Sequence, residues 1–338
     1  MSENRYARQQ ILPEIGVEGQ QRLADSSVLI LGYGALGCVH GELLARAGVG
    51  RIRIVDRDLV EFTNLQRQIA FDEQDANSQT PKAEAAARRL RAINSSIVIE
   101  ADAIDVTPRN IEAFIRDVDV VLDATDNFET RYLLNDACVK FDKPWIYGGV
   151  IGTEGVTMAI LPGAGPCLRC LMPDPPTAGS FPTCDTSGVL NAAVAIIASW
   201  QAAAALRLLV GSMPPQQRLV SIDCWNGLFN SFAVNKEDGC PCCGLRNFEF
   251  LEAKRTAWTT VLCGRNAVQV TPPDAVNLDF TVLTERLQQA GRVLRSGLLL
   301  RFQTAEAEMA IFPDGRAIIM GTTDEAKARS FYAKYLGT

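Results

Sequence analysis

The stretch that decides the fold is Val28-Leu29-Ile30-Leu31-Gly32-Tyr33-Gly34-Ala35-Leu36-Gly37. An apolar, strand-like run leads here into a turn with three closely spaced glycines, and a helix-like segment follows. Glycines in such a turn let the backbone approach a phosphate closely, and the helix N-terminus favours the phosphate charge. We expect Gly32, Gly34, Ala35 and Gly37 to line a nucleotide site. The turn alone fits NAD, FAD or ATP, and glycines that only pack a helix on a strand are the lesser alternative.

Strand-like and helix-like segments alternate throughout residues 26–150. The apolar runs that we expect to be strands are Val28–Leu31, Ile52–Asp56, Ile97–Ala101, Val118–Asp123 and Trp145–Val150. Helical spacing is found at Leu36–Ala47, Lys82–Ile93, Ile111–Ile115 and Phe128–Phe141. Runs of Val, Ile and Leu without polar alternation are typical of parallel strands with helices on both faces of the sheet. The sequence therefore predicts a doubly wound, Rossmann-like α/β domain.

The chain changes character after Val150. We expect a strand at Gly155–Leu161, a functional loop rich in Pro, Gly, Ser and Thr at residues 162–187, and a helix at Val189–Val210 that is buried in the core or at a subunit contact. Leu219–Asp223 and Leu228–Val234 would extend the sheet with antiparallel strands. These segments complete a first domain at residues 1–250.

A separate small α+β domain is expected at residues 256–338. Its predicted elements are a strand at Thr259–Val270, a helix at Thr281–Ala290, two strands around the turn Pro313-Asp314-Gly315 and a helix at Asp324–Tyr335. The role of this domain is open between docking of a partner and stabilisation of the chain.

The composition argues against a nucleic-acid-binding, a secreted or a membrane protein. The 338 residues carry 33 basic and 39 acidic side chains, and a net charge of −6 argues against a nucleic-acid surface. The polar start of the chain differs from a secretory signal, and no apolar run reaches the roughly 20 residues of a membrane span. We therefore expect a cytoplasmic protein that binds neither nucleic acid nor membrane. The ten cysteines are then expected to be thiols, metal ligands or a nucleophile.

Polar residues around the glycine turn favour a triphosphate. Asp56 ends the second predicted strand, where a carboxylate can accept hydrogen bonds from ribose hydroxyls. Arg67, within Asn64-Leu65-Gln66-Arg67-Gln68, and Lys82 supply two cations that can neutralise phosphoryl charge. A nicotinamide enzyme needs these cations less and usually has a proton donor such as histidine, whereas the one histidine, His40, is expected to pack within the first helix.

Two aspartates follow the fourth predicted strand, in the run Asp123-Ala124-Thr125-Asp126-Asn127. Ligands of such sheets bind at the carboxyl ends of the strands, so Asp126 is placed to hold Mg²⁺ beside the phosphates. For Asp123, a role in the site and capping of the next helix are open alternatives.

Five cysteines stand out by their spacing or position. Cys167-Leu168-Arg169-Cys170 and Cys240-Pro241-Cys242-Cys243 supply the four thiolates of a tetrahedral zinc site with a structural role. A redox dithiol and unrelated core cysteines are the alternatives. Cys184 precedes a predicted helix, where a thiol can become a nucleophile, although the adjacent Asp185 opposes this effect.

Taken together, these motifs resemble those of the ThiF/MoeB/HesA family, the adenylating enzymes of ubiquitin-like sulfur carriers and relatives of the ubiquitin-activating enzymes. The resemblance covers roughly residues 3–250. It rests on Arg5-Tyr6-Ala7-Arg8-Gln9, on Glu18-Gly19-Gln20, and on the glycine turn, the charged motifs and the two cysteine pairs in the same order.

The resemblance implies an ATP site with defined roles. The phosphates would lie on the glycine turn and the ribose on Asp56. Arg67 and Lys82 would clamp the phosphates, Asp126 would organise Mg²⁺, and Asn64 would assist nearby. Such chemistry depends on positioning and charge neutralisation, which agrees with the shortage of histidine.

The resemblance also implies partners. Arg8 would reach the active site of a neighbouring protomer, which makes the protein a homodimer. The Gly-Gly tail of a small carrier would lie under the loop, where its carboxylate attacks the α-phosphate to give an acyl-adenylate and pyrophosphate. In some branches a cysteine at the position of Cys184 takes part in carboxyl or sulfur transfer, and in others a separate persulfide donor attacks.

Two departures from the family pattern are visible. Family members commonly continue with Gly-Pro after Gly188-Val189-Leu190, but here Asn191-Ala192-Ala193 follows. The C-terminal unit is also too short for the rhodanese domain of some fused members. The expected function is ATP-dependent adenylation of a sulfur carrier for thiamine or molybdopterin biosynthesis. An NAD(P)-dependent oxidoreductase and a catalytically inactive scaffold are the alternatives.

Overall fold

The computed structural model describes residues 4–175, 187–212, 217–252, 259–262, 266–272, 277–305 and 307–336. The chain forms two compact units, Met1–Ala253 and Lys254–Thr338, and each is described here by itself.

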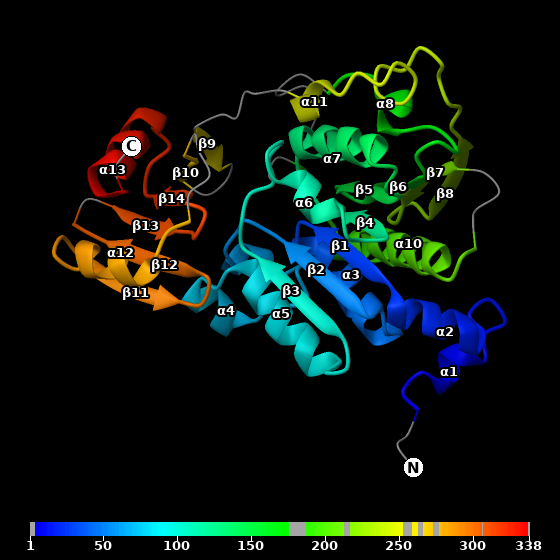
Figure 1. Cartoon of the computed structure of the whole chain (residues 1–338), viewed down its shortest axis with the longest axis horizontal. Coiled ribbons are helices and arrows are strands. Elements are labelled where there is room, and N and C mark those ends of the chain that lie inside the picture. Colours follow the sequence, from blue (N-terminus) through cyan, green and yellow to red (C-terminus); the bar gives the residue numbers. More distant parts are fainter. Residues whose placement is uncertain are drawn as a thin grey trace. The chain divides into compact units, whose positions relative to one another are not determined.

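An eight-stranded sheet forms the centre of the first unit, in the order β3-β2-β1-β4-β5-β6-β7-β8 (Figure 1). The parallel strands are β1 (Ser27–Leu31), β2 (Arg51–Val55), β3 (Val98–Asp102), β4 (Val120–Asp123) and β5 (Trp145–Ile151). The antiparallel extension consists of β6 (Glu154–Ile160), β7 (Arg218–Asp223) and β8 (Leu228–Ala233). The predicted doubly wound sheet with an antiparallel extension is thus confirmed.

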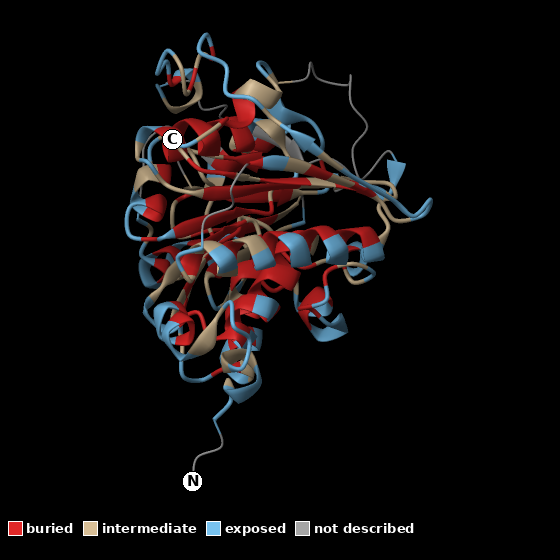
Figure 2. Ribbon diagram, turned by 90° about the vertical axis from the view of Figure 1, so that its right-hand side faces the viewer, coloured by how far each residue is buried: buried red, intermediate tan, exposed pale blue. Residues whose placement is uncertain are grey.

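Helices cover both faces of this sheet. On one face, α6 (Ile111–Ile115) and α7 (Phe128–Lys140) pack into an apolar core. On the other face, α3 (Ala35–Ala47) and α10 (Asn191–Leu209) share a second core, and α5 (Lys82–Ile93) packs beside α3. Figure 2 shows the sheet strands as a largely buried layer between these helices. Strand β1 has β2 on one side and β4 on the other, so the topological switch point lies at its carboxyl end.

Six helices of the first unit were not predicted from the spacing of apolar residues in the sequence. They are α1 (Ala7–Gln10), α2 (Gly16–Asp25), the 3-10 helix η1 (Phe62–Asn64), α4 (Glu73–Ser78), α8 (Leu168–Leu171) and α11 (Glu249–Glu252). Helix α8 falls within the expected loop at residues 162–187, of which residues 176–186 lie outside the described part. Among the described helices, α10 alone has the length and apolar composition of a membrane span, and its inner side packs on β5, β6 and α3.

The second unit is a six-stranded antiparallel sheet in the order β11-β12-β13-β14-β10-β9. The strands are β9 (Thr259–Leu262), β10 (Ala267–Val270), β11 (Arg292–Ser296), β12 (Leu299–Gln303), β13 (Glu308–Ile311) and β14 (Ala317–Met320). Helices α12 (Phe280–Leu287) and α13 (Glu325–Leu336) contribute to its apolar core. The predicted small α+β architecture is confirmed. The single strand expected at Thr259–Val270 is wrong, because the chain reverses and pairs β9 with β10.

Candidate functional site

The glycine turn connects β1 to α3 and packs against the end of β4. Gly32 has a φ of +85°, and a Cβ atom there would lie 2.7 Å from the Ala124 carbonyl oxygen. A Cβ atom at Gly37 would collide with the Gly32 carbonyl oxygen. Gly34 caps α3 and has open space beside it, since the nearest atom to a Cβ there is Gln68 Nε2 at 3.8 Å. Gly32 and Gly37 therefore permit the close packing of the turn, and Gly34 leaves open space at the N-terminus of α3, which begins at Ala35.

Asp56 follows β2 and lies directly beside the turn. Its carboxylate accepts hydrogen bonds from the backbone N–H of Tyr33 at 2.5 Å and of Asp58 at 2.7 Å. Burial raises the pKa of this carboxyl, and the charge of Lys82 opposes the rise. Because a carboxylate offers about four lone pairs, two remain for a ribose hydroxyl. Asp56 thus fixes the turn and can still accept from a ligand.

Lys82 is the first residue of α5 and points back toward the loop after β2. Its ammonium Nζ lies 3.1 Å from Asp58 Oδ2, and the lysine side chain is 4% exposed. Arg57, in the same loop, lies 3.1 Å from Asp105. Burial lowers the pKa of Arg57, but the surrounding carboxylates, Asp105, Asp58, Asp126 and Asp56, outweigh this effect and raise it. Two cations are thus held among carboxylates at the carboxyl ends of the parallel strands.

The run from Asn64 to Gln68 forms the next wall of the site. Asn64 is buried, and its side-chain oxygen accepts from the Glu61 N–H at 3.1 Å. The Arg67 guanidinium donates to the Thr63 carbonyl at 2.8 Å and is partly exposed. Gln68 is buried, and its Oε1 has no hydrogen-bond partner among the described residues. An orphaned amide oxygen next to the open side of the glycine turn indicates space for a polar ligand.

The two aspartates after β4 have different surroundings. Asp126 is exposed at the carboxyl end of the strand, so its oxygens are accessible to a hard cation such as Mg²⁺. Asp123 is fully buried, accepts from both the N–H and the hydroxyl of Thr125, and lies 3.3 Å from the Arg131 guanidinium. Helix α7 is capped by Asn127 instead. Neither alternative for Asp123 describes its position well, because it holds the loop that carries Asp126.

Arg131 completes this support. Its guanidinium donates to the carbonyls of Thr125, at 2.6 Å, and of Gly148, at 3.2 Å. The pKa of Arg131 is lowered by burial, but the charge of Asp123 outweighs this effect and raises it. Burial raises the pKa of the Asp123 carboxyl, and the charge of Arg131 opposes this rise. The two side chains together join the end of β4 to β5.

Arg8 lies far from the glycine turn of its own chain. It is exposed on α1, which is attached to the C-terminal end of α3: the Tyr6 ring packs on Gly48, and Gln9 donates to the Ala47 carbonyl. The 13 residues of α3 separate the two ends by about 20 Å. The structure thus brings the predicted phosphate-site residues together, with the exception of Arg8.

The chain after residue 186 returns to the site. Leu190 N–H donates to the Gly152 carbonyl, and the Asn191 amide donates to the Gln66 carbonyl at 3.3 Å. The start of α10 therefore lies beside the residue that precedes Arg67. Cys184 lies outside the described residues.

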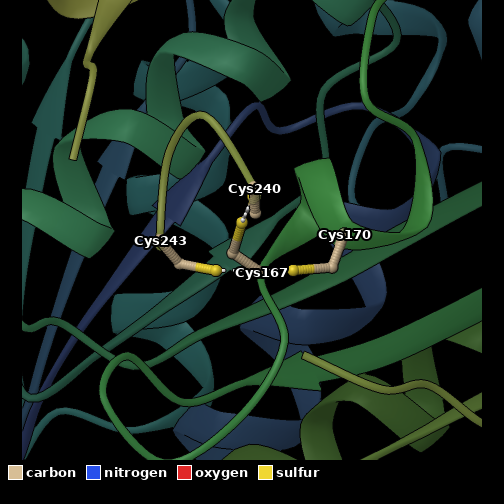
Figure 3. A group of neighbouring side chains, drawn as sticks. All are labelled: Cys167, Cys170, Cys240 and Cys243. Atoms are coloured by element: carbon tan, nitrogen blue, oxygen red, sulfur yellow. Dashed lines mark hydrogen bonds between the residues drawn. The ribbon is translucent and has the colours of Figure 1, made fainter. Parts of the chain in front are cut away.

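Four cysteines from two distant segments converge on one point (Figure 3). The sulfurs of Cys167, Cys170, Cys240 and Cys243 all lie within 4.8 Å of one another, and two pairs approach to 3.6 and 3.4 Å. Zn–S bonds of about 2.3 Å place the sulfurs of a tetrahedral site about 3.8 Å apart, so the donor set fits zinc.

The cluster is held from the side by α7. The buried Asn135 accepts from the Leu168 N–H at 2.9 Å and donates to the Cys242 sulfur at 3.2 Å. One amide therefore joins the loop that holds the first cysteine pair to the loop that holds the second.

Sequence reasoning missed four polar residues around the glycine turn and, beside the cysteine cluster, Asn135. Asp58 and Arg57 adjoin Asp56, and Gln68 closes the run that starts at Asn64, so their positions were a usable signal. Arg131 had no such signal, because its partners become neighbours only in the folded sheet.

Comparison with known proteins agrees with this arrangement. Residues 6–242 match the ThiF family. The sulfur carrier protein ThiS adenylyltransferase of Bacillus subtilis is 43% identical over 336 residues, which cover 98% of this chain and 99% of that protein. A sulfur carrier protein adenylyltransferase of Thermus thermophilus is 40% identical over 247 residues, or 71% of this chain and 90% of that protein. A crystal structure of Escherichia coli MccB with ATP has the same fold, with a TM-score of 0.63 and 24% identity over 72% of this chain and 75% of that one.

Proposed function

The chain belongs to the ThiF family and is an adenylyltransferase, and from this membership and the site geometry we propose that it uses ATP to activate the C-terminal glycine carboxylate of a small ubiquitin-like sulfur carrier. The observation that supports the site most directly is the meeting of the glycine turn, Asp56 and the Lys82–Asp58 pair at the switch point of the sheet. The carrier would serve thiamine or molybdopterin biosynthesis.

The reaction is a nucleotidyl transfer. A carboxylate oxygen of the carrier forms a bond to the α-phosphorus, the bond from that phosphorus to the bridging oxygen breaks, and pyrophosphate leaves with the electron pair. The residues in the site need not exchange a proton with the substrate, but they must neutralise charge and align the reactants. We assign the phosphates to the glycine turn, Arg67 and Lys82, and the ribose to Asp56, with Asn64 nearby.

Lys82 would exchange partners when ATP binds. In the structure its ammonium lies 3.1 Å from Asp58 Oδ2, and the lysine side chain is almost wholly buried. A phosphate at the turn offers stronger charge than one carboxylate, so Lys82 can turn to it while Asp58 becomes available to a cation. Asp126 would hold Mg²⁺, which, when bound, offsets the charge of the phosphates.

Zinc is proposed for the four-cysteine cluster as a structural ion. Four thiolates with this spacing leave no open position for substrate, and the cluster joins the segment after β6 to the segment after β8. We also propose a cytoplasmic location, because ten cysteines that serve as thiols and metal ligands are typical of a reducing compartment.

We further propose a homodimer in which Arg8 acts in the partner's site. Support comes from the position of α1, since the glycine turn of the same chain lies about 20 Å away along α3. The carrier tail would enter near the start of α10. Sulfur would then come from a persulfide donor, and Cys184 is a candidate for the transfer step.

The test is ATP–pyrophosphate exchange with a purified carrier that ends in Gly-Gly. We expect exchange with the wild-type chain and a loss of at least about 100-fold in Arg67→Ala, Lys82→Ala and Asp126→Ala, because each removes one charge from the transition state. Arg116→Ala is the matched control, since this exposed arginine directly after α6 pairs with Glu112 of the same helix.

Two results would overturn the proposal. One is the absence of exchange with any Gly-Gly carrier while ATP binding persists. The other is tight NAD(H) binding with weak ATP binding, which would favour an oxidoreductase.

A further inference from the structure

A buried glutamine of α10, Gln201, joins the ends of two neighbouring strands. Its side chain is fully buried on the inner side of the helix. The side-chain nitrogen Nε2 donates to the carbonyl of Asp123, the last residue of β4, at 2.9 Å and to the carbonyl of Ile146 in β5 at 3.1 Å. The paired stretch of β4 and β5 ends at Leu122 and Ile146, so the glutamine bridges the two strands where their own pairing stops.

The backbone of β5 leaves space for this amide. Gly148 has no side chain, and a Cβ atom at this position would collide with the amide group of Gln201. The φ of Gly148 is not positive, so the backbone conformation suits other residues as well. The glycine is therefore needed here for the space that it leaves to Gln201.

Arg131 of α7 holds the same strand ends from the opposite face of the sheet. Its guanidinium donates to the Thr125 carbonyl at 2.6 Å and to the Gly148 carbonyl at 3.2 Å, and it lies 3.3 Å from the Asp123 carboxylate. Asp123 is thus held twice, at its carboxylate by Arg131 and at its backbone carbonyl by Gln201. The loop that continues β4 therefore starts from a fixed point.

His40, the one histidine of the chain, sets the orientation of the glutamine amide. Its Nε2 lies 3.0 Å from Gln201 Oε1, and the ring is fully buried. Because a carbonyl oxygen only accepts hydrogen bonds, the NH2 group of Gln201 must face the two strand carbonyls, and Oε1 must face the ring. Burial lowers the pKa of His40 to about 4, so the ring is neutral at pH 7. Nε2 therefore carries the proton, and Nδ1, which has no hydrogen-bond partner among the described residues, is unprotonated.

We propose that Gln201, oriented by His40, is a positioning residue for the adenylation reaction. It fixes the end of β4, so that Asp126, three residues beyond Asp123, lies where it can hold Mg²⁺ beside the phosphates. The role of Asp126 in this inference rests on the proposed function, whereas the bridge rests on the contacts of Gln201. A displacement of about 1 Å in a site can cost about 100-fold in rate, so the support that Gln201 gives to this loop matters for the reaction.

A positioning role and a purely structural role differ in the effect of excess Mg²⁺. If the amide of Gln201 positions Asp126, a variant without the amide binds Mg²⁺ more weakly, and a higher concentration restores the rate. If the amide only stabilises the fold, the variant contains fewer active molecules, and added Mg²⁺ restores nothing.

The first measurement is the ¹⁵N spectrum of the histidine ring in the untagged wild-type chain. With one histidine in 338 residues, labelling with ¹⁵N-histidine gives the signals of His40 alone. We expect a protonated Nε2 and an unprotonated Nδ1 at pH 7. A proton on Nδ1 instead would contradict the orientation of the Gln201 amide and overturn the proposal.

The second measurement compares Gln201→Met with Gln217→Met in ATP–pyrophosphate exchange. Methionine has nearly the volume of glutamine but cannot donate to the strand carbonyls. Gln217 is also buried, and its side chain accepts from the Leu161 N–H directly after β6, so Gln217→Met is the matched control. We expect the Mg²⁺ concentration at half of the maximal rate to rise about 10-fold in Gln201→Met and to stay unchanged in Gln217→Met. High Mg²⁺ should restore most of the rate of Gln201→Met.

A binding measurement avoids any dependence on turnover. Mn²⁺ accepts the oxygen ligands that Mg²⁺ accepts, and its paramagnetic resonance reports the fraction that is bound in the presence of ATP. We expect the affinity for Mn²⁺ to fall about 10-fold in Gln201→Met and in Gly148→Ala, which keeps the glutamine but fills its space. Circular dichroism identifies the folded variants, and Gly148→Ala serves as the test if Gln201→Met does not fold. Wild-type affinity for Mn²⁺ in a folded variant would overturn the proposal.

Failure of this inference and failure of the proposed function give different results. Weaker Mn²⁺ binding in Gln201→Met, with no pyrophosphate exchange by the wild-type chain for any Gly-Gly carrier, supports the positioning role and contradicts the function. Carrier-dependent exchange, with a Gln201→Met variant that behaves as Gln217→Met does, contradicts the positioning role and leaves the function intact.

Discussion

Mixing two inactive variants tests whether Arg8 serves the partner's site. Arg8→Ala removes the arginine from α1, and Arg67→Ala removes the one beside the glycine turn. Each homodimer should lack exchange, because every site in it lacks one of the two cations. In a mixed dimer, the Arg8→Ala subunit retains its own Arg67 and receives Arg8 from its partner, so one of the two sites is complete.

The structure sets the size of the effect. Arg8 and the turn of the same chain are separated by the length of α3, about 20 Å, so within one chain the two arginines do not complete one site. Random reassociation of equal amounts makes half of the dimers mixed, and each has one working site of two. The mixture should therefore regain about a quarter of the wild-type exchange rate.

The assay is ATP–pyrophosphate exchange after the two variants have been mixed, dissociated with mild denaturant and refolded together. The control is a mixture of Arg67→Ala with Lys82→Ala, whose losses both lie in the site of the same subunit. In that pair each site of the mixed dimer is damaged, so no recovery is expected. A mixture of the first pair that stays inactive, although mixed dimers are present by mass, would show that Arg8 does not act across the interface.

Three further predictions concern support of the sites and stability. Metal analysis should find about one zinc per chain. Asn135→Ala should weaken zinc binding about 10- to 100-fold in a competition with a chromophoric chelator, because it removes the hydrogen bonds that join the two cysteine loops. Equal affinity in the variant would contradict this prediction. Asp123→Ala should lower the free energy of unfolding in urea by about 3–5 kcal/mol, since Arg131 would remain buried without its counter-ion, and a loss below about 1 kcal/mol would refute the ion-pair argument. Burial lowers the pKa of His40 from 6.5 to about 4, so the unfolded state binds a proton between these values while the folded state does not. Stability should thus fall by about 3 kcal/mol as the pH drops from 7 to 4, and His40→Gln should show a shallower fall in parallel urea titrations.

The sheet could be predicted because burial and sequence pattern coincide there. Lys82–Ile93 is a helix as predicted, and the parallel strands lie within two residues of their expected positions, since both faces of the sheet are covered and the runs are continuously apolar. Helices α1 and α2 were missed because they are polar and held by side-chain bonds such as that from Gln9 to the Ala47 carbonyl. Strand β11 was missed because its sequence, RVLRS, is mostly exposed.

The sequence indicates which residues gather near the glycine turn, but it does not indicate which of them contact one another. Strand ends and the glycine turn indicate where a nucleotide lies, because the carboxyl ends of parallel strands meet at one edge. Two ion pairs depend on how a helix packs against a loop in the folded chain. They are Lys82 with Asp58 and Asp123 with Arg131. Local patterns carry no information on such pairs when the partners are 24 and 8 residues apart and both polar.

Helix α10 shows why one pattern can have two causes. An apolar run of this length predicts burial in the core or at a subunit contact, and the structure shows burial in the core for the inner side of the helix. The inner side is fixed by the sheet, where Gln201 bonds to His40 and to the carbonyls of Asp123 and Ile146. The residues on the outer side at the middle of the helix, Ala195, Ile196, Ser199, Trp200 and Ala203, carry no charge. Ile196 and Trp200 stay exposed on the outer side, so the apolar pattern of such a helix does not tell which of its sides the core covers.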